Sequence, residues 1–301
     1  MSDPVDAEDL VLEEERVLDL VRRHVPGVHR VMSVDETGHR ARTYLVDADI
    51  VLKTQRQTRI RPETSLAKEV FLLQTLHKES TVSVPMVLGY GNDEGMEYTV
   101  MTRMPGFAMR TLDIDDAHRH VALEALGVTL RRIHSLEQQS FVASGHFDGA
   151  LTENDVNRTL RVSFADAIEV LGATPVGWTF ALSPEQVAMR LLEALPDEHD
   201  VEVLHANPGP QHTFLHADSS TFSGLIDFGD AYASHPVFDF RPWRSPGDQE
   251  KVLSGYTSEA PVNEGFMSTW RASLVLGLFR VAGRKGTADA MPDLARWLAH
   301  T

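Results

Sequence analysis

Two short apolar runs, each followed by an aspartate, most constrain what this chain can fold into. The apolar pair 214–215 leads into a His-Ala-Asp sequence that ends at Asp218, and the apolar run 224–226 leads directly into Asp227. Short apolar runs bounded by polar residues are typical of buried strands. A buried strand that ends in an acid points the acid into a cleft, and two such acids can bind a divalent cation and accept a proton from a hydroxyl. Phosphoryl transfer needs little more from a protein, apart from a cation for the phosphates.

The length and composition of the chain are those of a globular protein. Its 301 residues suggest one or two domains, and 42% hydrophobic with 24% charged residues is an ordinary balance. No apolar run approaches the ~18 residues that indicate a membrane span. The acidic stretch 1–16 does not fit a secretory or transit signal. The absence of cysteine excludes disulfides, thiolate nucleophiles and cysteine-based zinc sites, and a cytoplasmic protein is the default expectation.

The chain is strongly acidic, with a formal net charge of −16. This charge argues against a nucleic-acid partner or an anionic membrane, and it suits a small cationic molecule. It is equally explained by solubility alone, because net charge acts first on solubility.

A lysine and an acid in the N-terminal third have the spacing of a strand and a helix. Lys53 closes the apolar run 50–53, which we predict to be a strand, and the segment 63–78 carries apolar residues at helical spacing. Glu69, on the inner side of this helix, can pair with Lys53 and hold it in place. Taken alone, each residue is equally well a solvated charge.

Three motifs taken together resemble the aminoglycoside and small-molecule phosphotransferase family, which shares the protein-kinase fold. They are the His-Ala-Asp at 216–218, the sequence IDFGDA at 226–231 and the sequence HPVFDF at 235–240. The family pattern is an HGD catalytic loop, an Asn a few residues later, a metal-binding turn like the kinase D-F-G, and a DPxxD segment. The resemblance spans about residues 15 to 300.

The resemblance implies a role for each residue of these motifs. Asp218 is expected to be the catalytic base, with His216 supporting its loop. Asp227 is expected to bind Mg²⁺, and Asp239 is expected to brace the catalytic loop as a structural acid. Ser223 stands at the position that counts as the metal-binding Asn.

The resemblance also implies an α+β, protein-kinase-like fold of two lobes. Residues 1–104 are expected to form a nucleotide-binding N-lobe with a small antiparallel sheet and one main helix. Residues 105–301 are expected to form a larger, mostly helical C-lobe that carries the catalytic loop and binds the acceptor. Lys53, clamped by Glu69, would steady the phosphates of ATP or GTP. The hinge between the lobes would contact the adenine through Met101, Thr102, Arg103 and Met104.

One departure from the family pattern leaves two functions open. Asp227 follows Asp218 by nine positions, about half the spacing of the kinase signature, and no Asn lies between them. Either a hydroxyl at 219, 220 or 223 or a water completes the metal shell, which Mg²⁺ tolerates because it keeps waters readily. Or the chain is a catalytically impaired, nucleotide-binding member of the same fold. Asn207 is a further metal candidate by residue type alone.

The leading prediction is therefore transfer of the γ-phosphoryl group of ATP or GTP, with Mg²⁺, to a hydroxyl of a small molecule. An aminoglycoside-like antibiotic or an amino alcohol is the expected acceptor, and the protein is expected to be a monomer or a homodimer. An unrelated hydrolase built on His216 and Asp218 is less favoured, because the chain has no G-x-S-x-G elbow, HExxH zinc motif or cysteine nucleophile.

Overall fold

The computed structural model describes residues 11–38, 40–56, 66–79, 81–147, 153–173, 178–285 and 291–298. Contacts divide the chain into two compact units. The first comprises Met1–Asp113 with Pro210–Ala231, and the second comprises Ile114–Gly209 with Tyr232–Thr301. The segment 210–231, which the sequence places in the C-lobe, thus makes its contacts with the N-terminal unit.

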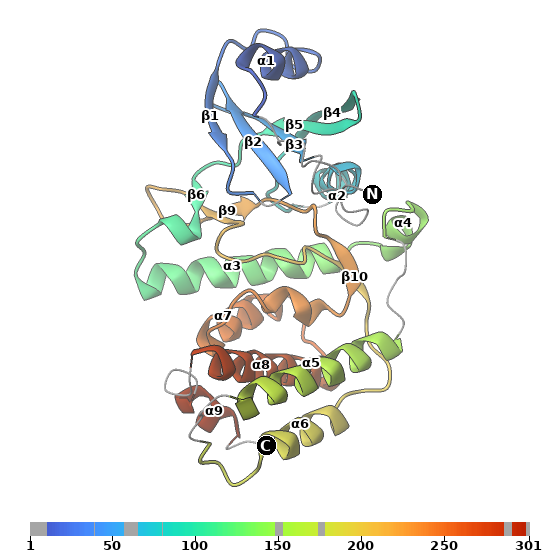
Figure 1. Cartoon of the computed structure of the whole chain (residues 1–301), viewed down its shortest axis with the longest axis vertical. Helices are drawn as coiled ribbons and strands as arrows, with labels where there is room; N and C mark the ends of the chain where they lie inside the picture. The colour runs from blue at the N-terminus through green and yellow to red at the C-terminus, as the bar shows by residue number, and fades with distance from the viewer. Residues whose placement is uncertain are drawn as a thin grey trace, which may run out of the picture. The chain divides into compact units, whose positions relative to one another are not determined.

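The first unit is built on an antiparallel sheet with the strand order β1-β2-β3-β5-β4 (Figure 1). Side chains in β2 alternate between half-buried and buried positions, as expected for a sheet with one covered face. The strands are β1 (Val31–Asp35), β2 (Ala41–Val46), β3 (Ile50–Gln55), β4 (Val87–Asp93) and β5 (Met96–Thr102).

Two helices accompany this sheet. The first, α1 (Glu14–Arg22), presents an apolar stripe that joins the core made by the sheet, in which Tyr44 and Leu52 are fully buried. The second, α2 (Leu66–Glu79), contacts β4 and β5 and carries two buried charged residues, Lys68 and Glu69, in its first turn. Charged residues are rarely buried without partners, so these two mark a site.

A second, three-stranded sheet completes the first unit. It has the order β6-β8-β9 and comprises β6 (Phe107–Ala108), β8 (Thr213–Leu215) and β9 (Phe222–Leu225). Gly106, before β6, has φ +86°, and a Cβ there would lie 2.0 Å from the carbonyl oxygen of Leu215. Only glycine allows the chain to pass this close to β8.

The second unit is mostly helical. The most extensive packing in this unit is between the helices α3 (Asp116–His134) and α7 (Pro246–Tyr256), which approach closely at two glycines. A Cβ on Gly127 would lie 2.0 Å from the carbonyl oxygen of Val252, and one on Gly255 would lie 1.9 Å from that of Glu124. The unit also contains the 3₁₀ turn η4 (Pro236–Phe240), the helix α4 (Gln138–Ala143), and a two-stranded ladder of β7 (Glu202–Leu204) and β10 (Tyr232–Ser234).

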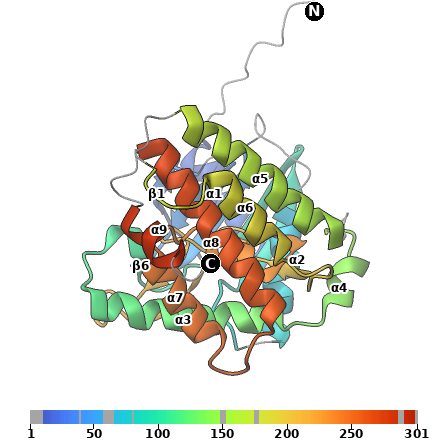
Figure 2. The ribbon, with the colours of Figure 1, turned by 90° about the horizontal axis from the view of Figure 1, so that it is seen from below.

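A layer of helices formed by α5 (Glu153–Ala173) and α8 (Glu264–Lys285) lies in the same unit. Figure 2 shows these two helices side by side, and Phe164 meets Phe279 edge-on between them. The remaining helices are α6 (Pro184–Glu193), which a Ser183–Gln186 capping box begins, and α9 (Met291–Leu298). The structure thus confirms a small antiparallel sheet with one main helix and a larger, mostly helical part.

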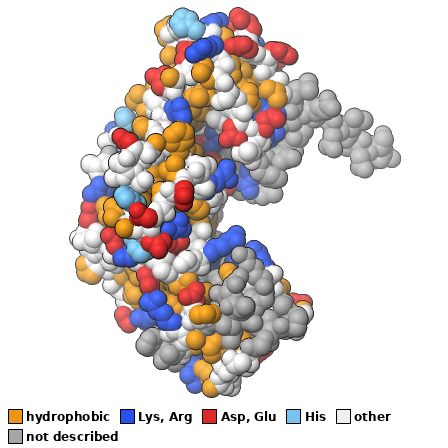
Figure 3. Space-filling model, turned by 90° about the vertical axis from the view of Figure 1, so that its left-hand side faces the viewer, with side chains coloured by type: hydrophobic (Ala, Val, Ile, Leu, Met, Phe, Trp, Pro, Cys, Tyr) orange, Lys and Arg blue, Asp and Glu red, His pale blue; other side chains and the backbone are white. Residues whose placement is uncertain are grey.

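Acidic and basic side chains are mixed on the face seen in Figure 3. Figure 3 shows acidic and basic side chains interspersed on one face, without a single acidic patch that would account for the net charge of −16. No helix in the described ranges has the length and apolar character needed to cross a membrane.

Candidate functional site

Lys53 is at the centre of a charge cluster in the first unit. Its ammonium lies 2.7 Å from Oε2 of Glu69 and 2.6 Å from Oδ1 of Asp227. The side chains of Lys53 and Glu69 are 12% and 1% exposed, whereas that of Asp227 is 41% exposed. Three residues that are far apart in the sequence therefore meet where one positive charge faces two negative charges. Asp227 is the member of the cluster that solvent reaches.

Local structure explains how Lys53 and Glu69 meet. Lys53 follows the alternating burial of β3, between Thr43 of β2 and Thr99 of β5. Glu69 is in the first turn of α2, where the helix dipole favours an acid. Its second oxygen, Oε1, accepts a hydrogen bond of 3.1 Å from the backbone N–H of Phe228. Glu69 thus ties α2 to both β3 and the turn that follows β9.

The turn that carries Asp227 is held on both sides. Asp227 has φ +67°, a left-handed conformation that Asp tolerates better than most residues. The buried Lys68 donates a hydrogen bond of 2.6 Å to the carbonyl oxygen of Ala231, and Arg40 forms an ion pair with Asp230. These contacts fix the backbone on which the Asp227 carboxylate stands.

Lys53 stays protonated within this cluster. Burial alone would lower the pKa of Lys53, but the carboxylates of Asp227 and Glu69 outweigh burial and raise that pKa above its ordinary value. Burial raises the pKa of Glu69, although the Lys53 ammonium and the Phe228 N–H oppose this rise. Lys53 is therefore a protonated, preorganised cation, which is what binding of a phosphate requires.

The hairpin of β8 and β9 separates Asp218 from Asp227, contrary to the expectation that these acids converge. Leu215 pairs with Phe222 beside the turn 216–221, so the exposed Asp218 is in that turn. Asp227 follows the opposite end of the hairpin, where His212 precedes β8 and places its Nε2 3.2 Å from Oδ2 of Asp227. Because a strand rises ~3.3 Å per residue, β9 alone spans roughly 10 Å between these two ends of the hairpin.

His216 supports the turn that holds Asp218 through its main chain, whereas Ser223 has a partner away from Asp227. The main chain of His216 closes the hairpin turn, accepting a hydrogen bond from Ser220 and donating one to Thr221, both of 2.9 Å. The buried hydroxyl of Ser223 donates a hydrogen bond of 2.6 Å to the carbonyl oxygen of Pro105. Ser223 therefore links β9 to the hinge segment and does not contribute a hydroxyl to the Asp227 carboxylate.

The predicted hinge is engaged with the sheet over most of its length. The backbone N–H of Thr102 donates to Met86 at 2.9 Å, and that of Arg103 donates to Asp49 at 2.7 Å. The side chains of Met101 and Met104 are both 5% exposed. Neither the Thr102 nor the Arg103 amide is thus available to a base, which leaves the main chain of Met104 as the candidate for adenine contact.

In the second unit, Asp239 braces a different loop from the one predicted. Its fully buried carboxylate accepts hydrogen bonds from the backbone N–H groups of His205 at 2.8 Å and Ala206 at 2.7 Å. His134 Nε2 lies 3.0 Å from the same carboxylate, and His134 Nδ1 lies 3.1 Å from the hydroxyl of Tyr256. The braced segment directly follows β7, where Ala206 has φ +75°, a conformation that favours glycine.

This bracing favours a second register for the expected catalytic loop. The kinase signature has the form H-R-D-x-x-x-x-N. With His205 as its first residue, Asn207 takes the position of the catalytic Asp, and His212 takes that of the metal-binding Asn. Asn207 precedes Asp227 by twenty positions, which removes the spacing anomaly found with Asp218. The short spacing from Asp218 to Asp227 was thus the signal in the sequence that favours this second register.

His235 also departs from the family pattern, in the DPxxD segment. It is 2% exposed, and burial lowers its pKa to about 3, so the imidazole is neutral. Its Nδ1 accepts a hydrogen bond of 3.2 Å from the backbone N–H of Val237 and caps η4. A neutral imidazole thus performs the capping that an Asp side chain commonly performs.

Comparison with known proteins agrees with this fold. The sequence profile described as the phosphotransferase enzyme family matches residues 31–248. Wild-type aminoglycoside 2'-phosphotransferase-IIIa, as its GDP complex, is 16% identical over 96% of this chain and 99% of that chain, with a TM-score of 0.62. Macrolide 2'-phosphotransferase MphH from Brachybacterium faecium is 20% identical over 95% of this chain and 99% of that chain, with a TM-score of 0.59. The protein chain of the streptomycin-ATP-APH(2")-IIa ternary complex is 15% identical over 90% of this chain and 89% of that chain, with a TM-score of 0.60. A search of curated protein sequences found no match.

The profile match covers more than half of the chain. The fold is the protein-kinase-like fold of small-molecule phosphotransferases. The chain belongs to the phosphotransferase enzyme family.

Asp227 offers an acidic ligand for one Mg²⁺. Within the described part of the chain, no three His, Asp or Glu side chains form a group that could hold a metal. Mg²⁺ commonly uses one or two carboxylates with substrate phosphates and water, so Asp227 meets the minimum. His212 is a poor substitute for the Asn that holds the second ion of kinases, because imidazole suits softer metals.

Proposed function

We propose that this chain binds a nucleoside triphosphate through Lys53 and transfers its γ-phosphoryl group to a hydroxyl of a small molecule. The observation that carries the proposal is the buried pair of Lys53 and Glu69, whose atoms lie 2.7 Å apart. A cation fixed in this way can steady phosphate oxygens without reorganising, and positioning dominates phosphoryl transfer. ATP and GDP are named with structures of the same fold, which supports ATP or GTP as the donor, since GDP is what GTP becomes when its γ-phosphoryl group leaves.

The acceptor is proposed to be a hydroxyl-bearing molecule that also carries positive charge. Streptomycin and kanamycin are named with structures similar to this chain, and a further one is a macrolide phosphotransferase. The net charge of −16 favours a basic acceptor over an acidic one. An aminoglycoside-like antibiotic or an amino alcohol meets both conditions.

Within this proposal the residues have separate tasks. Lys53 binds the phosphates, and Glu69 positions it. Asp227 would hold Mg²⁺, which offsets the charge that develops on phosphate oxygens when it is bound. Asn207, in the position of the catalytic Asp, can orient the acceptor hydroxyl by hydrogen bonding, but its amide cannot take the hydroxyl proton as a carboxylate does. We therefore expect slow transfer.

A second candidate function is a nucleotide-binding protein of the same family without turnover. The replacements at Asn207 and His212 favour it, because they remove the general base and the second metal ligand of the kinase signature. Binding through Lys53 alone would remain possible and would depend little on metal.

Titration with ATP and GTP, with and without Mg²⁺, tests the shared part of both candidates. Lys53→Met should abolish nucleotide binding, whereas Lys251→Met, which removes a half-exposed lysine paired with Glu124, should not change it. If the Lys53→Met variant and the wild type bind nucleotide with equal affinity, both candidate functions are ruled out.

Turnover separates the two candidates. Transfer of radiolabelled γ-phosphate is measured over aminoglycosides, macrolides and amino alcohols. Phosphoryl transfer by the wild type that is lost in the Asp227→Asn variant supports the phosphotransferase. Metal-independent nucleotide binding with no transfer to any acceptor supports the binding protein.

A further inference from the structure

A pocket in the second unit has not been assigned to any function above. Its volume is about 360 Å³, within the range of small-molecule sites. The end of α3, the segment before and within β7, η4, the end of α7 and the beginning of α8 form its walls. None of its lining residues belongs to the Lys53 cluster.

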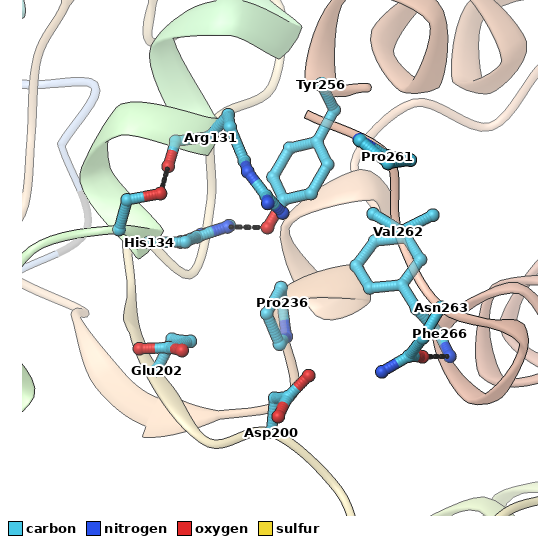
Figure 4. A pocket seen from close by; sticks show the side chains of 11 residues that line it. Arg131, His134, Asp200, Glu202, Pro236, Tyr256, Pro261, Val262, Asn263 and Phe266 are labelled. Atoms are coloured by element: carbon cyan, nitrogen blue, oxygen red, sulfur yellow. Dashed lines mark hydrogen bonds between the residues drawn. The ribbon is translucent and has the colours of Figure 1, made fainter. Parts of the chain in front are cut away.

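One side of the pocket is acidic. Asp200 and Glu202 both line it, and Figure 4 shows their carboxylates on the side across from Tyr256 and Phe266. Oε2 of Glu202 is buried and has no hydrogen-bond partner among the described residues. Burial, together with the charge of Asp200, raises the pKa of Glu202 to about 7, against the opposing charge of Arg131. A buried acceptor without a partner costs free energy, which a donor from a ligand would recover.

The opposite side of the pocket is aromatic. Tyr256 and Phe266 stack with their ring centroids 5.3 Å apart and an interplanar angle of 20°. The guanidinium of Arg131 covers the Tyr256 ring, 5.1 Å from its centroid, and its charge is thus held on that wall. A ligand that enters therefore meets apolar surface on one side and two carboxylates on the other.

We propose that this pocket binds a small organic amine, with its ammonium at Glu202 and Asp200 and its apolar part against Phe266. An ammonium supplies the donor that Oε2 of Glu202 lacks, and a charge-assisted hydrogen bond is about twice as strong as a neutral one. Above pH 7, where Glu202 is ionised, two carboxylates against one guanidinium leave the pocket negative, so an anionic ligand is disfavoured. The proposal does not depend on the proposed nucleotide site.

The pocket is connected to the loop after β7. His134 lines the pocket and hydrogen-bonds Asp239, which accepts the backbone N–H groups of His205 and Ala206. Glu202 is itself on β7, three residues before His205. A bound amine therefore contacts both structures that position this loop, and we expect it to stabilise the loop.

Phenethylamine is a suitable probe because it joins an ammonium to one aromatic ring. Isothermal titration should show saturable binding with a Kd of about 1 mM, as expected for so small a ligand. Its neutral analogue 2-phenylethanol should bind at least about tenfold more weakly, because it lacks the charge. Equal binding of the two compounds, or no binding of phenethylamine, would overturn the proposal.

Variants locate the ammonium. Glu202→Gln keeps the shape of the side chain and should weaken phenethylamine binding about tenfold, and Asp200→Asn should weaken it less because Asp200 is exposed. Glu198→Gln removes the same charge from an exposed residue outside the pocket and should leave binding unchanged. Unchanged binding in Glu202→Gln, or equal losses in all three variants, would show that the amine binds elsewhere. Circular dichroism confirms that each variant is folded.

Discussion

Replacing Lys53 with Met should destabilise the protein mainly through Glu69. Removing one partner of a buried ion pair costs about 3–5 kcal/mol, because it leaves the other charge buried and uncompensated. The Glu69 side chain is 1% exposed and would keep only the Phe228 N–H, whereas Asp227 is 41% exposed and loses little. We therefore expect a loss of about 3 kcal/mol in the free energy of unfolding at pH 8, measured by urea denaturation.

The pH dependence of this loss identifies its cause. Burial already raises the pKa of Glu69, and without Lys53 the folded state would hold the Glu69 proton more tightly than the unfolded state. Stability of the variant should therefore recover as the pH falls from 8 towards 5. The double variant Lys53→Met/Glu69→Gln should recover most of the loss at pH 8, and Lys251→Met should cost at most about 1 kcal/mol. A loss below about 1 kcal/mol in Lys53→Met, or no recovery in the double variant, would refute the reasoning.

Four further predictions follow from single contacts. Asn207→Asp should raise phosphoryl transfer by about 100-fold, measured with an acceptor found by screening, because a general base contributes at least that much; an unchanged rate would place the base elsewhere. Asp239→Asn should lower the free energy of unfolding by about 2 kcal/mol, because its buried carboxylate accepts two backbone N–H groups; a loss below 0.5 kcal/mol would contradict this. Gly127→Ala should cost about 1–3 kcal/mol, since its Cβ would meet the carbonyl oxygen of Val252, whereas Gly145→Ala meets no atom and tests backbone strain alone at φ +70°. Glu202→Gln should stabilise the protein by about 1 kcal/mol at pH 8, after allowing for solvent screening, and by nothing at pH 5. The folded pKa of Glu202, about 7, lies above the ordinary 4.5, so the stability of the wild type falls as the pH rises between these values. Equal stabilities of variant and wild type at pH 8 would argue against this reasoning.

The meeting of Lys53 with Glu69 could be predicted from the sequence because each residue is placed by a local period. Alternating burial places Lys53 on β3, and helical spacing places Glu69 on the inner face of α2. These periods predicted the strand and the helix, whereas the pairing of the two side chains was expected from the resemblance to the kinase fold. The structure brings the two side chains together at 2.7 Å.

The register of the catalytic loop could not be found from motif letters alone. The His-Ala-Asp at 216–218 matches the family motif better than the His-Ala-Asn at 205–207 does. The short spacing to Asp227 already argued against Asp218, and the tertiary structure adds that Asp239 binds the amides of His205 and Ala206 while Asp218 is in an exposed hairpin turn. The pocket beside β7 was equally hidden, since five separate segments form its walls.

The replacements at Asn207 and His212 bear on how the charge of Asp227 is balanced. In the kinase signature, metal ions offset the charge of this acid and of the phosphates. Here Oδ1 of Asp227 already lies 2.6 Å from the Lys53 ammonium, and Oδ2 lies 3.2 Å from an imidazole. Both oxygens of Asp227 thus already have a partner within the protein, so nucleotide binding and metal-dependent transfer can be separated in this chain. Nucleotide affinity that barely changes when Mg²⁺ is removed would follow from this balance, whereas a strict requirement for Mg²⁺ would mean that Lys53 alone does not neutralise the phosphates.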